Sequence, residues 1–339
     1  MTGSEPDHPD PHKEAGTMPV TQEQAYRFQA TFDGLCANIN AAILGKDHVV
    51  RLALTCLLSE GHLLLEDCPG TGKTSLARAL ANTIAGTQAR IQFTPDLLPS
   101  DVTGVQVFDQ NTGQFDFHPG PIFHSIVLAD EINRASPKTQ SALLEVMEEG
   151  RVTVDGKPRE VGKPFMVIAT QNPIEQGGTY PLPEAQLDRF LMKTSLGYPD
   201  HEAMVALMQD AARRDRAGHV QAVMPAANIA PLSRLADHMT VRPEVLGYVS
   251  ELATATRQHP HVKLGVSARG CLAYVRCAKT WAISQGRTSV TPDDIRTLAK
   301  PILSHRVLVN DEAVFDGVTV DAVLREIFTQ VPVPLVRAA

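Results

Sequence analysis

The amino-acid sequence predicts an α/β fold: a parallel sheet between helices, with two inserted hairpins and a helical domain at the C-terminal end. Unbroken apolar runs that lead into loop-like stretches are typical of strands buried on both faces. Helical segments alternate with these runs, which indicates an α/β architecture. After residue 198 the chain becomes Ala-rich and helical. The four apolar runs comprise residues 63–65, 126–129, 165–169 and 190–192.

Apolar residues at helical spacing predict a first helix from about residue 21. Residues 43–46 interrupt this pattern, and a second apolar helix continues to about residue 58. Further helices are expected over 75–85 and 137–149, and from residue 292 onward. The last two each place Pro in the first turn after a Ser or Thr cap. The buried face of the first helix is predicted to comprise Phe28, Phe32, Leu35 and Ile39.

Two hairpins are expected to interrupt the sheet. Residues 105–107 and 115–117 alternate in polarity on either side of Asn111-Thr112-Gly113. Residues 152–154 lead into Asp155-Gly156, a strong hairpin-turn signal. These segments are too polar for central strands, so they are predicted to project from the sheet.

Composition narrows the class of protein. The 339 residues carry a net charge of −7 and no long basic run, so no nucleic-acid footprint is indicated. The five cysteines form no C-x-x-C pair, which favours reduced thiols and a cytoplasmic location. No apolar run reaches transmembrane length, so no membrane insertion is expected. We expect a disordered tail over residues 1–20, an α/β core over 21–198 and a helical domain over 199–339.

A phosphate-binding loop is predicted after the first strand. Glycines let backbone N–H groups close around phosphates, and the following helix adds its positive N-terminal end. Lys73 is expected to reach the β- and γ-phosphates of ATP, and the Thr74 hydroxyl to bind Mg²⁺. Asp67 stands where the common pattern has Gly, so its carboxylate is expected to point away from the phosphates. The predicted nucleotide-binding residues are Cys68, Pro69, Gly70, Thr71, Gly72, Lys73, Thr74 and Ser75.

Polar residues at the ends of two later strands point to hydrolysis. Asp130 and Glu131 end the strand over 126–129, and in phosphate-loop enzymes the first acid holds Mg²⁺. Glu131 is the predicted general base for the attacking water. Asn172 follows the next strand, where its amide could contact both water and γ-phosphate; a turn Asn before Pro is the structural alternative.

Two arginines are further candidates. Arg189 lies between a predicted helix and the last strand, and Arg269 opens a helix in the C-terminal half. Spacing alone gives neither a catalytic role, because surface arginines are often paired with carboxylates.

The chain resembles the MoxR family of AAA+ ATPases from about Phe28 to about Leu308. The resemblance is carried by several segments, which together are far more specific than the phosphate loop alone. They are residues 120–123, 129–135, 138–145, 170–176 and 178–190.

This resemblance implies an AAA+ core with a helical lid that assembles as a homo-oligomeric ring, commonly a hexamer. Asn172 would match the first sensor, Arg189 the finger that reaches a neighbour's γ-phosphate, and Arg269 the second sensor. Leu44 and Gly45 would pack near adenine. The two hairpins would match inserts that line or approach the pore. The resemblance also implies a partner with a von Willebrand factor A domain and a chaperone-like action on a protein client.

Two other functions remain open from the sequence. A nucleic-acid motor would need cations along its pore hairpin, whereas the first hairpin carries Asp109 and Asp116. A scaffold that binds nucleotide only to assemble would not need Glu131, Asn172 and Arg189 together.

Overall fold

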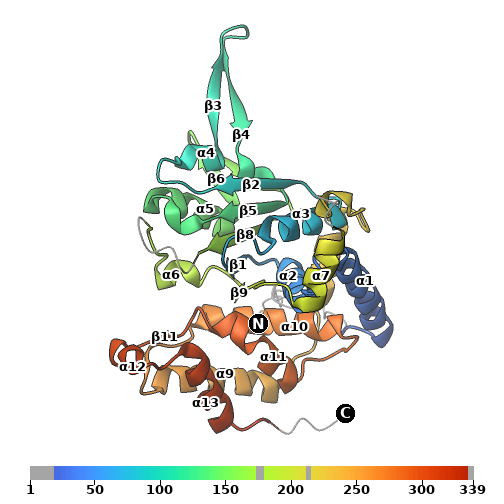
Figure 1. Ribbon diagram of the computed structural model, residues 1–339, viewed down its shortest axis with the longest axis vertical. Helices are drawn as coiled ribbons and strands as arrows, with labels where there is room; N and C mark the ends of the chain where they lie inside the picture. The colour runs from blue at the N-terminus through green and yellow to red at the C-terminus, as the bar shows by residue number, and fades with distance from the viewer. Residues whose placement is uncertain (1–18, 173–178, 211–214, 335–339) are drawn as a thin grey trace, which may run out of the picture.

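A five-stranded parallel sheet forms the centre of the protein (Figure 1). The computed structural model describes residues 19–172, 179–210 and 215–334. The strands lie in the order β2-β5-β8-β1-β9. Their bounds are β1 Leu63–Glu66, β2 Gln88–Gln92, β5 Ile126–Asp130, β8 Met166–Gln171 and β9 Met192–Thr194.

Side chains on the two faces of this sheet belong to two separate hydrophobic cores. Along β1, Leu63 and Leu65 belong to one core and Leu64 belongs to the other. The first core also takes α1 (Gln22–Asn40), α2 (Asp47–Leu58), α3 (Lys73–Thr83) and the C-terminal helices. The second core packs the sheet against α4 (Pro99–Thr103) and α5 (Pro137–Glu149). The predicted α/β fold, with strands buried on both faces, is confirmed.

The predicted strands differ from the structure at the sheet edges. Strand β2 was not predicted, because it alternates polar and apolar residues and only Ile91 is buried in it. The last strand begins at Met192, not Phe190. Leu191 instead donates its N–H to the His62 carbonyl, which turns the chain into the sheet.

Helix α1 begins where the sequence places it. Thr21 accepts the Gln24 N–H and closes a capping box with the Gln24 side chain. Val20 is already buried in the first core. The predicted disordered tail otherwise falls on residues 1–18, which lie outside the described residues.

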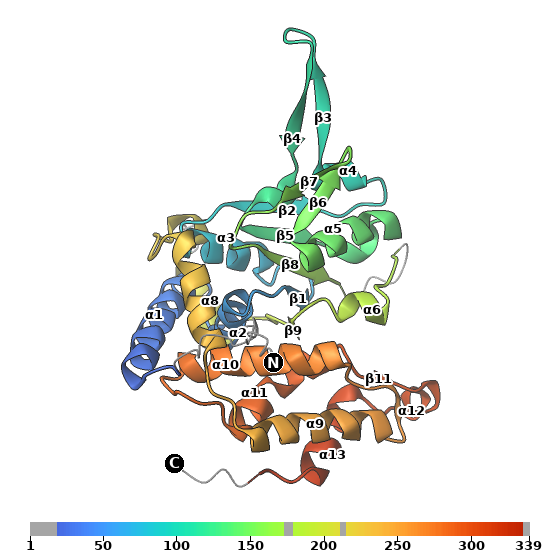
Figure 2. The same ribbon diagram turned by 180° about the vertical axis from the view of Figure 1, so that it is seen from behind.

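Both predicted hairpins are present. Strands β3 (Gly104–Asp109) and β4 (Gln114–Pro119) pair over their whole length, and β6 (Arg151–Val154) pairs with β7 (Lys157–Glu160). The β3–β4 hairpin stands far out from the sheet in both views (Figures 1 and 2). Gly120 closes its base, where a Cβ would lie 2.3 Å from the Val102 carbonyl oxygen.

The C-terminal half is helical, as predicted, and helices α9 to α11 and α13 form a layer beneath the sheet (Figure 2). Helix α10 also packs against α1 and α2. Two short strands, β10 (Val262–Leu264) and β11 (Leu308–Val309), pair within this half. No helix in the described ranges is both long and apolar enough to cross a bilayer. The helices are α7 His201–Gln209, α8 Ile229–Asp237, α9 Pro243–Gln258, α10 Ala268–Ser284, α11 Pro292–Leu303, α12 Asp311–Phe315 and α13 Val320–Gln330.

An ion pair between a buried arginine and a partly buried aspartate joins this helical half to the sheet. Arg306, just after α11, donates Nε to Asp188 Oδ1 at 2.7 Å. Its other nitrogens donate to the carbonyls of Phe190 at 2.7 Å and Leu191 at 3.2 Å. Ser267, the N-cap of α10, donates its hydroxyl to Asp188 Oδ2 at 2.9 Å. Both Asp188 oxygens therefore face the helical half.

A second buried polar contact fixes the end of α5. His62 Nε2 lies 2.9 Å from the Met147 carbonyl oxygen, and the Val167 N–H donates to Nδ1 at 3.0 Å. Since Nδ1 accepts, Nε2 carries the proton and the ring is neutral. Burial lowers the pKa of His62 to about 4.

His62 should make the folded state acid-sensitive. The unfolded chain takes up a proton near pH 6.5, but folded His62 does not until about pH 4. Stability is therefore full above pH 6.5 and falls by about 3 kcal/mol as the pH drops toward 4. Denaturant titrations between pH 5 and 7 give the slope of the unfolding free energy against pH, which reports the protons taken up on unfolding. In His62→Gln this slope should correspond to about one proton fewer than in the wild type. Exposed His48→Gln is the control, and an equal slope in His62→Gln and the wild type would contradict the assignment.

Candidate active site

The phosphate loop joins the carboxyl end of β1 to the start of α3. Gly70 has φ of 82° and Gly72, the N-cap of α3, has φ of 98°. Both lie in the left-handed region, which favours glycine. Lys73 donates Nζ to the carbonyls of Asp67 at 3.2 Å and Cys68 at 3.4 Å, so the lysine lies across its own loop. Helix α3 begins at Lys73, two residues before the predicted start.

Asp67 turns away from the loop, in agreement with the sequence-based expectation. Its buried carboxylate accepts the N–H of Leu196 at 2.5 Å and the N–H of Gly197 at 2.8 Å. Gly197 has φ of 61°. The unusual acid therefore ties the phosphate loop to the chain that leaves β9.

The same departing chain contacts Leu44-Gly45-Lys46. Lys46 donates Nζ to the Tyr198 carbonyl at 2.6 Å. A Cβ added at Gly45, which has φ of 70°, would lie 2.8 Å from Ala203 Cβ at the start of α7. Residues 196–203 thus lie between the phosphate loop and the segment predicted to pack near adenine.

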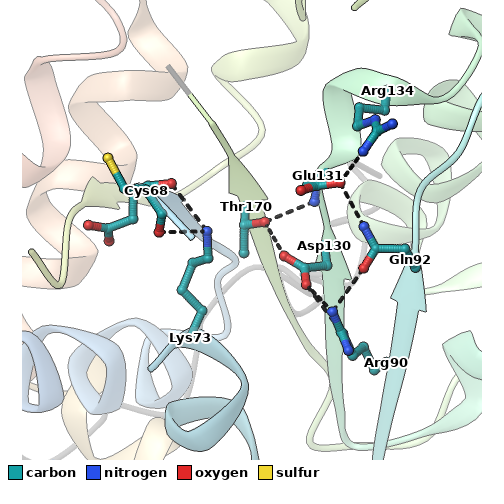
Figure 3. A network of polar contacts seen from close by, with 9 residues as sticks. Cys68, Lys73, Arg90, Gln92, Asp130, Glu131, Arg134 and Thr170 are labelled. Carbon is teal, nitrogen blue, oxygen red and sulfur yellow. Dashed lines mark hydrogen bonds and ion pairs between the residues drawn. The ribbon is translucent and has the colours of Figure 1, made fainter. Parts of the chain in front are cut away.

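The two acids at the end of β5 are linked by Thr170 on β8 (Figure 3). The Thr170 hydroxyl donates to Asp130 Oδ1 at 2.6 Å and accepts the Glu131 N–H at 2.9 Å. Glu131 has φ of 57°, a strained value for a residue with a side chain. Such strain persists where neighbouring contacts enforce it, and here the Thr170 contact does so.

Side chains from β2 and from the turn after β5 donate hydrogen bonds to both carboxylates (Figure 3). Arg90 donates to Asp130 Oδ2 through Nε at 3.2 Å and a terminal nitrogen at 2.6 Å. Gln92 donates to Glu131 Oε2 at 2.8 Å, and Arg134 donates to the same oxygen at 2.9 Å. The carboxylate of Glu131 is therefore restrained by two donors in this conformation.

These polar neighbours were not predicted from the sequence. Arg90 and Gln92 alternate along β2 and share a face, but β2 itself was not recognised. Thr170 lay in one of the segments that carry the family resemblance, residues 170–176, but was given no role of its own. The available signal was the parallel pairing of β5 with β8, which brings Thr170 beside Asp130.

Asn172 directly follows β8, which pairs with β5 as expected. The side chain is buried. Its place one residue beyond Gln171 puts it at the same edge of the sheet as Asp130 and Glu131, where the carboxyl ends of parallel strands meet.

Arg189 and Arg269 lie together beside a cavity whose lining, among the described residues, includes no residue of the phosphate loop. Glu148, near the end of α5, contacts Arg189 Nε at 3.0 Å and also pairs with Arg269. The cavity beside them has a volume of about 390 Å³. Its lining comes from the turn before β1, the end of α5, residues 188–191, α10 and Arg306.

Comparison with known proteins agrees with this geometry. Residues 62–192 match the ATPase family associated with various cellular activities (AAA), and residues 254–327 match an AAA lid domain. A crystal structure of a putative ATPase from Cytophaga hutchinsonii superposes with a TM-score of 0.86. That protein is 34% identical, and the match covers 92% of this chain and 98% of that one. The phosphate loop, the paired acids and these matches define an AAA+ ATPase, an enzyme that hydrolyses ATP.

Relatives then specify the family. Chaperone MoxR1 of Mycobacterium tuberculosis is 36% identical, with coverage of 91% of this chain and 84% of the relative. Protein MoxR of Paracoccus denitrificans is 31% identical, with coverage of 91% and 97%. An uncharacterized protein of Bacillus subtilis, YeaC, is 48% identical, with coverage of 89% and 94%. The chain belongs to the MoxR family of AAA+ ATPases.

Replacing Asp67 with the Gly that is common at this position of phosphate loops should lower the free energy of unfolding. Asp67→Gly removes a buried carboxylate and leaves the Leu196 and Gly197 N–H groups without their acceptor, a loss of about 2–4 kcal/mol. Chemical denaturation measures this loss. Asp67→Asn keeps one acceptor oxygen and should lie between Gly and the wild type. An unchanged stability in Asp67→Gly would show that the two hydrogen bonds contribute nothing.

Proposed function

We propose that this chain assembles into a hexameric ring, as the family resemblance implies, in which ATP is hydrolysed between neighbouring subunits. One observation carries this proposal: Arg189 and Arg269 converge on Glu148, in a cavity whose lining includes no phosphate-loop residue within the described ranges. Both arginines are partly exposed there. A partly exposed pair of cations, beside a cavity that its own phosphate loop does not line, suits a neighbour's γ-phosphate.

Within one site, each side chain has a proposed role. Lys73 binds the phosphates, Glu131 orients and deprotonates the attacking water, and Asn172 hydrogen-bonds water and γ-phosphate. Thr74 and Asp130 would hold Mg²⁺, because hard cations prefer oxygen ligands. The ion supplies charge stabilisation at the phosphates when bound. Release of Glu131 from Gln92 and Arg134 would precede its action on water.

The work that hydrolysis drives is proposed to be chaperone-like remodelling, maturation or cofactor insertion of a protein client, in the cytoplasm. The β3–β4 hairpin supports a protein client, because its outer part exposes apolar side chains. Phe108 is 50% exposed and Phe115 65% exposed, with ring centroids 5.1 Å apart. Such a patch suits contact with another polypeptide. The family resemblance adds a partner with a von Willebrand factor A domain.

Mixing two inactive variants tests whether Arg189 acts on a neighbour. Arg189→Ala retains an intact phosphate loop, and Lys73→Ala retains an intact Arg189. Each alone should lose ATPase activity, Arg189→Ala by roughly 10³-fold or more. A random 1:1 mixture should regain activity, because roughly a quarter of the head-to-tail interfaces are complete. Arg27→Ala, a surface arginine paired with Glu23, is the matched control. An inactive mixture, in rings verified by light scattering to contain both variants, would overturn the trans role.

Glu131→Gln separates binding from hydrolysis. This change keeps the shape of the side chain but removes the base, so turnover should fall by about 10²- to 10⁴-fold. Binding of a fluorescent ATP analogue should persist. Wild-type turnover in Glu131→Gln would assign the water-activating role to another residue.

A further inference from the structure

One carboxylate lies between the two arginines of the proposed trans site. Glu148 Oε2 is 3.0 Å from Arg189 Nε, and Oε1 accepts a hydrogen bond from a terminal nitrogen of Arg269. The three residues come from α5, the segment before β9 and α10. Glu148 is therefore the point where three distant parts of the chain meet.

The backbone around each of these residues is held by polar side-chain contacts. The Met147 carbonyl, next to Glu148, bonds the buried His62 ring. Asp188, next to Arg189, is held by Arg306 and by the hydroxyl of Ser267. Ser267 caps the helix whose second residue is Arg269, so one aspartate fixes the approach of both arginines.

Charge explains why an acid is needed at this point. Two guanidinium groups that converge on one place repel each other, and a single carboxylate between them offsets that repulsion. The set of three retains one net positive charge, and Arg276 lines the same cavity. Among the described residues Arg189 Nε has the ion-pair contact but no hydrogen-bond partner of good geometry. Arg189 is thus drawn toward Glu148 without being locked to it.

The same face carries an uncovered apolar residue. Leu272 lines the cavity, lies three residues after Arg269 on α10, and is 73% exposed. A large exposed leucine beside converging cations is typical of a surface that a second polypeptide covers. This agrees with a neighbouring subunit on this side.

We propose that Glu148 is a positioning residue for Arg189 and Arg269. Its carboxylate lies between the two guanidinium groups and keeps them side by side. Both groups then face the γ-phosphate bound to the next subunit. The inference rests on the proposed trans role of Arg189 and names the residue that makes the two arginines act as one unit.

Glu148→Gln tests this role with little change of shape. Turnover at saturating ATP should fall by about 10- to 100-fold, the size of effect that lost orientation produces. Binding of a fluorescent ATP analogue and ring assembly by light scattering should remain as in the wild type, because Glu148 lies outside the phosphate loop. Glu148→Asp keeps the charge one methylene shorter and should recover part of the turnover.

Glu149→Gln is the matched control, since the adjacent Glu149 pairs with Arg151 on the surface and away from both arginines. A double-mutant cycle supplies the decisive readout. If Glu148 acts through the arginines, the loss in the Glu148→Gln and Arg269→Ala double variant should be clearly smaller than the sum of the two single losses. A merely structural role would give additive losses together with a lower Tm and weaker assembly.

The outcomes separate this inference from the function on which it rests. Wild-type or faster turnover in Glu148→Gln, with Arg189→Ala inactive, would overturn the positioning role alone. Full activity in Arg189→Ala would instead overturn the proposed trans mechanism.

Discussion

The ion pair between Asp188 and the buried Arg306 is the contact on which the rest of the molecule depends. It joins the helical half to the sheet at the residue before Arg189. Ser267 uses the other Asp188 oxygen, so the start of α10 is fixed by the same side chain. Loss of Asp188 would leave the buried Arg306 guanidinium without its carboxylate, and an uncompensated buried charge typically costs about 3–5 kcal/mol. The aspartate therefore sets both the angle of the helical half and the place of the arginine pair.

At the other end of the sheet, β2 links the paired acids to the projecting hairpin. Arg90 and Gln92 hold Asp130 and Glu131, and the chain then passes through α4 directly into β3. Gly120 closes the hairpin base against the last residues of α4 and the first residue of β3. Close backbone packing transmits a displacement better than it absorbs one. A force applied to the hairpin would thus be transmitted through a short stretch of chain to Gln92, which restrains Glu131.

The sequence predicted those parts of the fold that depend on local patterns. Unbroken apolar runs identified the central strands, and Gly72-Lys73-Thr74 between a strand and a helix predicted the phosphate loop. Strand β2 was not predicted, because an edge strand with one buried residue has no distinctive hydrophobic pattern. Glu148 escaped for a different reason: its role depends on two arginines 41 and 121 residues away, and one of several glutamates at the end of a helix carries no local sign of that.

The placement of these residues makes a single subunit chemically incomplete under the proposed function. Each chain carries a phosphate loop with its acids, and separately an arginine pair held by Glu148. Within the chain, Glu131 is restrained by Gln92 and Arg134. Under the proposed function, an isolated subunit therefore has Lys73 at the phosphates but lacks both a neighbour's arginine pair and a free base. Since electrostatic stabilisation is usually the largest catalytic contribution, hydrolysis waits for assembly, which couples ATP consumption to the presence of a ring that can do work.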